Sequence, residues 1–186
     1  MIRSHFSFLA DLAGRATEEL APSIEAASRL VSTAALAGRT TFSFGNGGSA
    51  SQALHFAAEL LVRYKAERLP LPAVALTADV ATLTACANDY DFSLIFSRQI
   101  EALGKKGDVA LGLSTSGRSP NVVKGLEAAR ERGLSTILLT GENGRAEAAR
   151  WDVGVVVPST ETAHVQEIHL AVIHLVCRYV EEALKS

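Results

Sequence analysis

The sequence has few cysteines, little net charge and no long hydrophobic run, and each shortage excludes a class of protein. Its 186 residues include only two cysteines, Cys86 and Cys177, which is too few for a disulfide framework. A formal net charge of −2 leaves no positive excess for a nucleic-acid surface. No apolar run reaches the roughly 18 residues of a membrane-spanning helix, and the first residues lack the apolar core of a secretion signal. We therefore expect a cytoplasmic protein with neither a nucleic-acid nor a membrane partner.

The residues that are present predict one α/β domain spanning 1–186. Apolar residues make up 48% of the chain and charged residues 20%, enough for a full-sized core. Short apolar runs predict buried parallel strands, and segments of helical character lie between them. The strands are expected at 41–44, 73–77, 109–113, 136–139 and 153–157, and the helices at 50–64, 92–103, 120–132, 145–150 and 162–184. Such alternation predicts a parallel sheet covered by helices on both faces, with ligands beyond the carboxyl ends of the strands.

Residues 1–39 form a helical extension to the core at 40–186. Phe6, Leu9 and Leu12 recur at helical spacing, and a second stripe begins at Ile24. These stripes are wide for helices that pack against one sheet only. Ordinary core packing and packing against a second subunit, as part of a bundle, both remain open at this point.

The loop from Gly112 to Ser119 carries the clearest functional signal. It follows an apolar run, precedes a predicted helix and reads Gly-Leu-Ser-Thr-Ser-Gly-Arg-Ser. Four of its residues carry hydroxyls: Ser114, Thr115, Ser116 and Ser119. Hydroxyls, backbone amides and the positive end of a helix converge in such a loop, which favours phosphate. The spacing nearly matches the nucleotide P-loop, but Arg118 stands where that motif has lysine, so nucleotide and sugar phosphate both remain candidates.

A second loop, Gly45-Asn46-Gly47-Gly48-Ser49, follows the first predicted strand. Its glycines allow the backbone to approach a ligand, and Ser49 is a candidate cap for the next helix. The alternative is a tight strand-to-helix turn without a ligand. Asn88 and Asp89, taken alone, indicate a turn or a cap.

Two helices carry the side chains that are capable of chemistry. His55 and Glu59 are four residues apart and share one helical face, where they can bind a metal or couple an acid and a base. Such pairs are also common surface contacts. Gln166 and His174 are about 12 Å apart along a helix axis and ~80° apart around it, so their spacing does not indicate a metal site. On periodicity alone His169 is equally well placed.

In this order, the motifs resemble those of SIS (sugar isomerase) domain proteins, and more narrowly those of the phosphoheptose isomerases. The resemblance runs from about residue 41 to the C-terminus, and the first forty residues match only as two helices. It rests on Gly45-Asn46-Gly47-Gly48-Ser49, His55-Phe56-Ala57-Ala58-Glu59, Asn88-Asp89, Ser114-Thr115-Ser116-Gly117-Arg118-Ser119, and Gln166-Glu167-Ile168-His169 with His174. It implies a flavodoxin-like sheet of five parallel strands and a homotetramer with active sites at subunit interfaces.

The resemblance also assigns a role to each matched position. Glu59 and His174 correspond to the acid/base pair. A zinc site with one Zn²⁺ per subunit corresponds to His55, Glu59, Gln166 and His174. The residues that bind the sugar phosphate correspond to Asn46, Gly47, Gly48, Ser49, Glu59, Asn88, Asp89, Ser114, Thr115, Ser116, Ser119 and Gln166.

The implied reaction converts D-sedoheptulose 7-phosphate to D-glycero-D-manno-heptose 7-phosphate, the first step of ADP- or GDP-heptose biosynthesis. A proton moves between C1 and C2 through an enediol, with Glu59 as the better candidate base and His174 as proton donor. A residue held tightly by zinc is a poorer base, so the two cannot be full-time ligands and free acid/base groups at once.

Three other readings compete with this one. The DnaA initiator-associating proteins share the fold and the glycine loop but are non-catalytic binding modules, and they lack the residues that stand here as Glu59 and His174. Another SIS activity, such as a hexulose-phosphate isomerase or a sugar-phosphate-sensing regulator, is disfavoured by the Gln166–His174 helix and by the lack of a DNA-binding module. A P-loop nucleotide enzyme is disfavoured by the missing lysine.

Overall fold

The computed structural model describes residues 1–185, and its centre is a sheet of five parallel strands. The strands are β1 (Thr41–Gly45), β2 (Ala73–Ala75), β3 (Val109–Leu113), β4 (Ser135–Gly141) and β5 (Val153–Val157), in the order β2-β1-β3-β4-β5. This is the flavodoxin-like order, and it confirms the predicted fold class. Strand order reverses between β1 and β3, which is where such folds bind ligands beyond the carboxyl ends of the strands.

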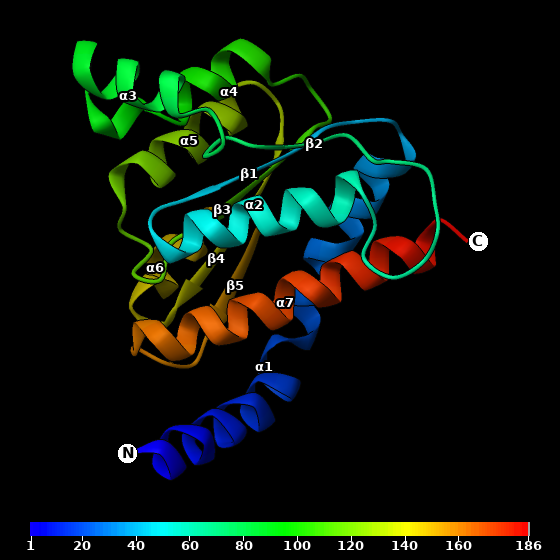
Figure 1. The fold of residues 1–186 in the computed structure, drawn as a ribbon, viewed down its shortest axis with the longest axis vertical. Coiled ribbons are helices and arrows are strands. Elements are labelled where there is room, and N and C mark those ends of the chain that lie inside the picture. The colour runs from blue at the N-terminus through cyan, green and yellow to red at the C-terminus, as the bar shows by residue number, and fades with distance from the viewer. Residues whose placement is uncertain (186) are drawn as a thin grey trace.

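Helices cover both faces of the sheet (Figure 1). One face carries α1 (Ile2–Leu36), α2 (Gly48–Leu61) and α7 (Thr162–Ala183); the other carries α3 (Val80–Asp89), α4 (Ser97–Leu103), α5 (Pro120–Glu131) and α6 (Arg145–Ala148). Alternate strand residues serve the two faces, so Leu111 packs with the first set and Ala110 with the second. All five residues of β1 and of β3 are buried, as a two-sided parallel sheet requires.

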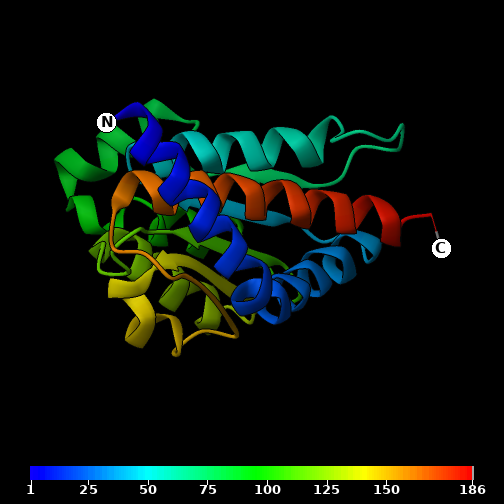
Figure 2. The ribbon, with the colours of Figure 1, turned by 90° about the horizontal axis from the view of Figure 1, so that it is seen from below.

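The N-terminal extension is one long helix rather than two separate ones. Pro22 lies inside α1, and the helix changes direction partway along its length, so that its first half crosses α7 (Figure 2). Proline lacks an N–H and its ring clashes with the carbonyl four residues earlier, which explains a bend at this position. Leu12 and Leu20 before the proline and Val31 after it all belong to the core cluster shared with α7.

Several element boundaries differ from the prediction. The expected helix 92–103 is divided into the 3₁₀ turn η1 (Phe92–Leu94) and α4, and the second strand ends at Ala75 rather than at residue 77. A second 3₁₀ turn, η2 (Glu142–Gly144), precedes α6. Among the described residues no helix is both long enough and apolar enough to cross a bilayer. Cys86 and Cys177 are both free and buried.

Candidate active site

The loops after β1 and β3 lie side by side because these strands are neighbours. Gly45 pairs with Leu113 at the carboxyl ends, and a Cβ on Gly45 would come within 2.8 Å of the Leu113 carbonyl oxygen. Asn46 and Asn121 join the two loops through reciprocal amide hydrogen bonds of 2.9 and 2.8 Å. The glycine loop and the hydroxyl loop therefore form one surface.

The predicted phosphate loop brings its hydroxyls together at the start of α5. Ser114 and Ser119 are joined by a hydrogen bond of 3.0 Å between their Oγ atoms, and the Ser116 Oγ accepts from the Arg118 backbone N–H at 3.2 Å. Gly117 turns the chain with a φ of +68°, which only glycine adopts at low cost. The Arg118 side chain is exposed. The result is a group of hydroxyls and the N-terminus of a twelve-residue helix, both of which suit an anion.

The start of α2 differs from the prediction that Ser49 caps it. The N-cap is Gly47, with a φ of +55°, and Ser49 lies in the first turn, where its buried Oγ is 3.4 Å from the Gln166 Nε2. A Cβ on Gly48 would come within 2.7 Å of the Gln166 Oε1, so this glycine makes room for the glutamine. Gln52 Nε2 donates to the Gln166 backbone oxygen at 2.7 Å. These contacts dock the first part of α7 against the glycine loop.

Farther along the same two helices, His55, Glu59 and His174 converge. The His55 Nε2 lies 3.1 Å from the His174 Nε2 and 3.2 Å from the Glu59 Oε1. Tyr64 stacks on the His174 ring at a centroid distance of 5.4 Å and an interplanar angle of 28°. The side chain of Glu59 is 21% exposed, and its Oε2 is buried without a hydrogen-bond partner among the described residues.

This cluster fits a zinc ion. Two imidazole nitrogens and a carboxylate oxygen are typical zinc ligands, and ligands about 2.0–2.1 Å from a tetrahedral ion stand roughly 3.3 Å from one another. The distances of 3.1 and 3.2 Å are close to that separation. The partnerless Glu59 Oε2 is a further atom that an ion or a substrate could satisfy. Gln166, the fourth residue of the predicted set, directs its amide to Ser49 and Gly48, and its place among the ligands remains a prediction.

Helical spacing on α7 did not distinguish His169 from His174, but the structure separates them: His174 belongs to the cluster with His55, and His169 lies in the core. His169 is fully buried, and burial lowers the pKa of its imidazole to about 4, with the backbone of Thr140 opposing the shift. It is therefore a neutral core side chain. Cys177, on the same helix, is also buried; burial and the negative charge of Glu59 raise the pKa of its thiol to about 12.

Three residues that hold the site together were not predicted from the sequence. Asn121 is 1% exposed, although it lies in the first turn of a helix where polar residues usually face solvent. Arg68 donates to the Glu59 backbone oxygen at 2.6 Å, and its Nε is 3.6 Å from the Glu181 carboxylate. Glu181 accepts from the backbone amides of residues 64–66, and these amides with Arg68 hold its pKa below the usual value despite the opposing effect of burial.

Asn88 and Asp89 are not brought to the cluster within this chain. They lie at the end of α3, exposed, and the Asn88 amide donates to the Asp89 carboxylate at 2.8 Å. Helix α3 covers the opposite face of the sheet from α2 and α7 (Figure 1). Contact of this pair with the sugar therefore remains a prediction.

The sheet order, with paired glycine and hydroxyl loops at its switch point, defines a class of α/β protein whose loops suit a phosphorylated ligand. A family profile described as the SIS domain matches residues 4–141. The chain is 52% identical over 168 residues to the phosphoheptose isomerase of Rhodospirillum rubrum, covering 90% of this chain and 89% of that protein. For the phosphoheptose isomerase of Shewanella frigidimarina the identity is 49% over 172 residues, with coverages of 91% and 87%.

Solved structures agree with the sequence comparison. The structure of the phosphoheptose isomerase of Neisseria gonorrhoeae superposes with a TM-score of 0.92 at 39% identity, covering 97% of both chains. The chain belongs to the phosphoheptose isomerase family of SIS-domain proteins.

Proposed function

We propose that the protein isomerises D-sedoheptulose 7-phosphate to D-glycero-D-manno-heptose 7-phosphate. The observation that carries the proposal is the convergence of His55, Glu59 and His174 on the two helices that also border the glycine loop. Gly48 and His55 are seven residues apart, or about 10 Å along α2, a span that an extended seven-carbon sugar phosphate can bridge. The loop from Ser114 to Ser119 holds the phosphate and so positions the far end of the sugar for reaction.

Proton transfer is assigned to Glu59 and His174. In the ketose-to-aldose direction Glu59 removes a proton from C1, the C1–C2 bond becomes the double bond of an enediol, and a proton returns to C2. His174 moves the hydroxyl protons between O1 and O2. The Glu59 Oε1 lies 3.2 Å from the His55 Nε2, while Oε2 is buried and has no hydrogen-bond partner among the described residues.

Zinc is proposed as the cofactor of this cluster, one ion per subunit, held by His55, Glu59, Gln166 and His174. When bound it would supply Lewis-acid polarisation of the substrate carbonyl. The chain's own contribution is the docking of α7 on α2, which sets the three described donors near tetrahedral separation.

The test is to incubate tag-free protein with sedoheptulose 7-phosphate, with and without a chelator, and to follow the sugar by NMR. New aldose signals are expected for the wild type. Glu59→Gln should bind the sugar without converting it, because an amide cannot accept the proton, whereas Glu101→Gln, at an exposed position of α4, should convert it normally. Absence of aldose in both wild-type tubes would defeat the proposal, and turnover by Glu59→Gln would remove Glu59 as the base.

The non-catalytic alternative, a binding protein of the DnaA initiator-associating type, is not favoured by the relatives, which are named as isomerases. The sugar-phosphate substrate and the two free cysteines fit the cytoplasm, which we propose as the location.

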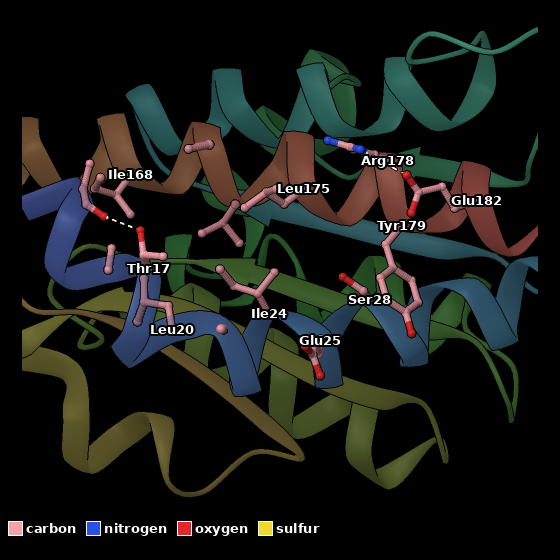
Figure 3. Close-up of a pocket in the computed structure, with 15 residues that line it drawn as sticks. Thr17, Leu20, Ile24, Glu25, Ser28, Ile168, Leu175, Arg178, Tyr179 and Glu182 are labelled. Atoms are coloured by element: carbon pink, nitrogen blue, oxygen red, sulfur yellow. Dashed lines mark hydrogen bonds and ion pairs between the residues drawn. The ribbon is translucent and has the colours of Figure 1, made fainter. Parts of the chain in front are cut away.

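We further propose that residues 1–39 mediate assembly into a homotetramer with active sites at subunit interfaces. An apolar groove of about 550 Å³ runs between α1 and α7, and Figure 3 shows Ile24 and Leu175 facing each other across it. Leu175 is 47% exposed and lines this groove. Leu175→Glu should dissociate the assembly in sedimentation velocity, whereas Leu103→Glu, similarly exposed but outside the groove, should not. A wild-type monomer would contradict the proposal.

A further inference from the structure

A second group of metal-binding side chains lies where the start of α1 crosses α7. His5 belongs to the first turn of α1, while His164 and Glu167 are three residues apart in the first turns of α7. The His5 Nε2 is 2.9 Å from the Glu167 Oε1, and the His5 Nδ1 is 3.2 Å from the His164 Nε2. No role in the proposed isomerase reaction has been given to any of the three.

We propose that His5, His164 and Glu167 form a second binding site, for a divalent transition-metal ion such as Zn²⁺. One donor atom from each residue lies within 4.8 Å of the other two, a spacing compatible with a shared ion. The two shortest contacts use different nitrogens of His5: Nε2 lies 2.9 Å from the Glu167 Oε1, and Nδ1 lies 3.2 Å from the His164 Nε2. Because one imidazole nitrogen binds one ion, the His5 ring must reorient so that a single nitrogen faces both neighbours.

The chemistry of the donors selects the kind of ion. Two imidazoles and one carboxylate suit zinc, cobalt or nickel, whereas calcium and magnesium prefer all-oxygen sites. Three protein ligands leave a fourth position for water. The His5 and Glu167 side chains are 39% and 36% exposed, so an ion can enter from solvent.

One polar atom in the group supports a bound ion. The Glu167 Oε2 is buried and finds no hydrogen-bond partner in the part of the chain that the structure describes, so an ion would satisfy it. Phe8 stacks on the His164 ring at a centroid distance of 4.4 Å, which fixes the ring and shields one side of the group. An apolar side chain beside a metal site limits the access of solvent to it.

This site would join parts of the chain that are far apart in sequence. An ion there would fasten the first turn of α1 to α7, more than 150 residues later. Glu167 follows Gln166 directly but projects about 100° away around the helix. The second ion is therefore expected to bind independently of the proposed catalytic one.

The experiment measures bound metal directly. Metal-stripped, tag-free protein is dialysed against Zn²⁺ and assayed by elemental analysis, and Co²⁺ absorption reports the ligand geometry. We expect two ions per subunit for the wild type, one for His5→Ala, and two for Arg3→Ala, an exposed control in the same turn. In the double variant His55→Ala, His174→Ala, only the ion at the second site should remain. Adding His5→Ala to this variant should weaken binding of that ion at least 100-fold. Loss of a residue that only hydrogen-bonds to a ligand typically costs about 10–100-fold.

Metal should also slow hydrogen exchange in residues 2–12 of the wild type but not of His5→Ala. The proposal is overturned if His5→Ala binds as many ions as the wild type, or if the His55→Ala, His174→Ala double variant binds none. Either result would leave His5, His164 and Glu167 as a hydrogen-bonded chain only. His5→Ala should retain isomerase activity, so failure of this proposal and failure of the proposed function are separable.

Discussion

Replacing Gly117 by alanine tests whether backbone contact shapes the phosphate loop. Gly117 has a φ of +68°, and a Cβ there would come 2.5 Å from the Cα of Gly144 in η2. The left-handed conformation costs an L-residue about 1–2 kcal/mol. The close approach adds about 1–3 kcal/mol of overpacking, because its partner is backbone that cannot rotate away. We therefore expect Gly117→Ala to lower the free energy of unfolding by about 2–5 kcal/mol.

Two other glycines separate these contributions. Gly38 has a φ of +66°, but no atom lies within 4 Å of the position that a Cβ would take, so Gly38→Ala should lose only the conformational part, about 1–2 kcal/mol. Gly14 lies in α1 with a negative φ and open space around it. Gly14→Ala should stabilise the protein by about 0.5–1 kcal/mol, because alanine is the better helix former.

Urea denaturation measures the stabilities, and steady-state kinetics with sedoheptulose 7-phosphate measures the effect on the loop. Displacement of the hydroxyls from the phosphate should raise KM about tenfold or more for Gly117→Ala, equivalent to 1.4 kcal/mol of binding, and should leave KM unchanged for Gly38→Ala. If Gly117→Ala is as stable as Gly38→Ala and keeps the wild-type KM, the contact with Gly144 does not set the conformation of the loop.

Three further predictions concern the buried polar groups. Asn121→Ala should cost about 2–4 kcal/mol in urea denaturation, since it removes two amide hydrogen bonds and leaves Asn46 unpaired. The pKa of His169 is about 4 in the native protein, against 6.5 in the unfolded chain. Between pH 7 and pH 5 the unfolded chain therefore takes up a proton at this residue while the native protein does not, and the wild type should lose about 2 kcal/mol of stability. His169→Gln should not show this loss. Arg68→Met should destabilise by about 1–3 kcal/mol, because it removes the hydrogen bonds to the backbone oxygens of Glu59 and Leu60 and the positive charge beside Glu181, which keeps its backbone-amide partners. Adding Glu181→Gln should recover the electrostatic part of the loss, and no recovery would contradict the ion-pair account.

Much of the fold was predictable because buried strands can be recognised in the sequence as short runs of apolar residues. The runs at 109–113 and 153–157 match β3 and β5 residue for residue, since a strand covered on both faces needs consecutive apolar side chains. The long helix α1 was harder. The resemblance implies two helices there, yet the core contacts of Leu20 and Val31 on either side of Pro22 carry one helix through as a bend.

The candidate site was less predictable, because it depends on which segments pack together. The hydroxyls of the phosphate loop lie within six residues and could be recognised as a group. The pairing of Asn46 with Asn121 joins residues 75 apart, and no periodic pattern marks a buried asparagine in a helical first turn. Likewise His174 and His169 are equivalent by spacing, and only the docking of α7 against α2 directs one toward His55 and buries the other.

Buried polar contacts at both ends of the α2–α7 pair set the geometry of the cluster. At one end, Gln52 and Ser49 hold Gln166 against the glycine loop. At the other, Arg68 links the Glu59 backbone to the Glu181 carboxylate, which also binds the chain that follows α2. The helices are thus tied on either side of His55, Glu59 and His174, so their separation is set by protein contacts. An ion that enters such a site meets ligands already in place and needs little reorganisation of the chain. Chelation should therefore remove metal-dependent activity while leaving the secondary structure intact by circular dichroism, and unfolding on chelation would show that the ion itself holds the two helices together.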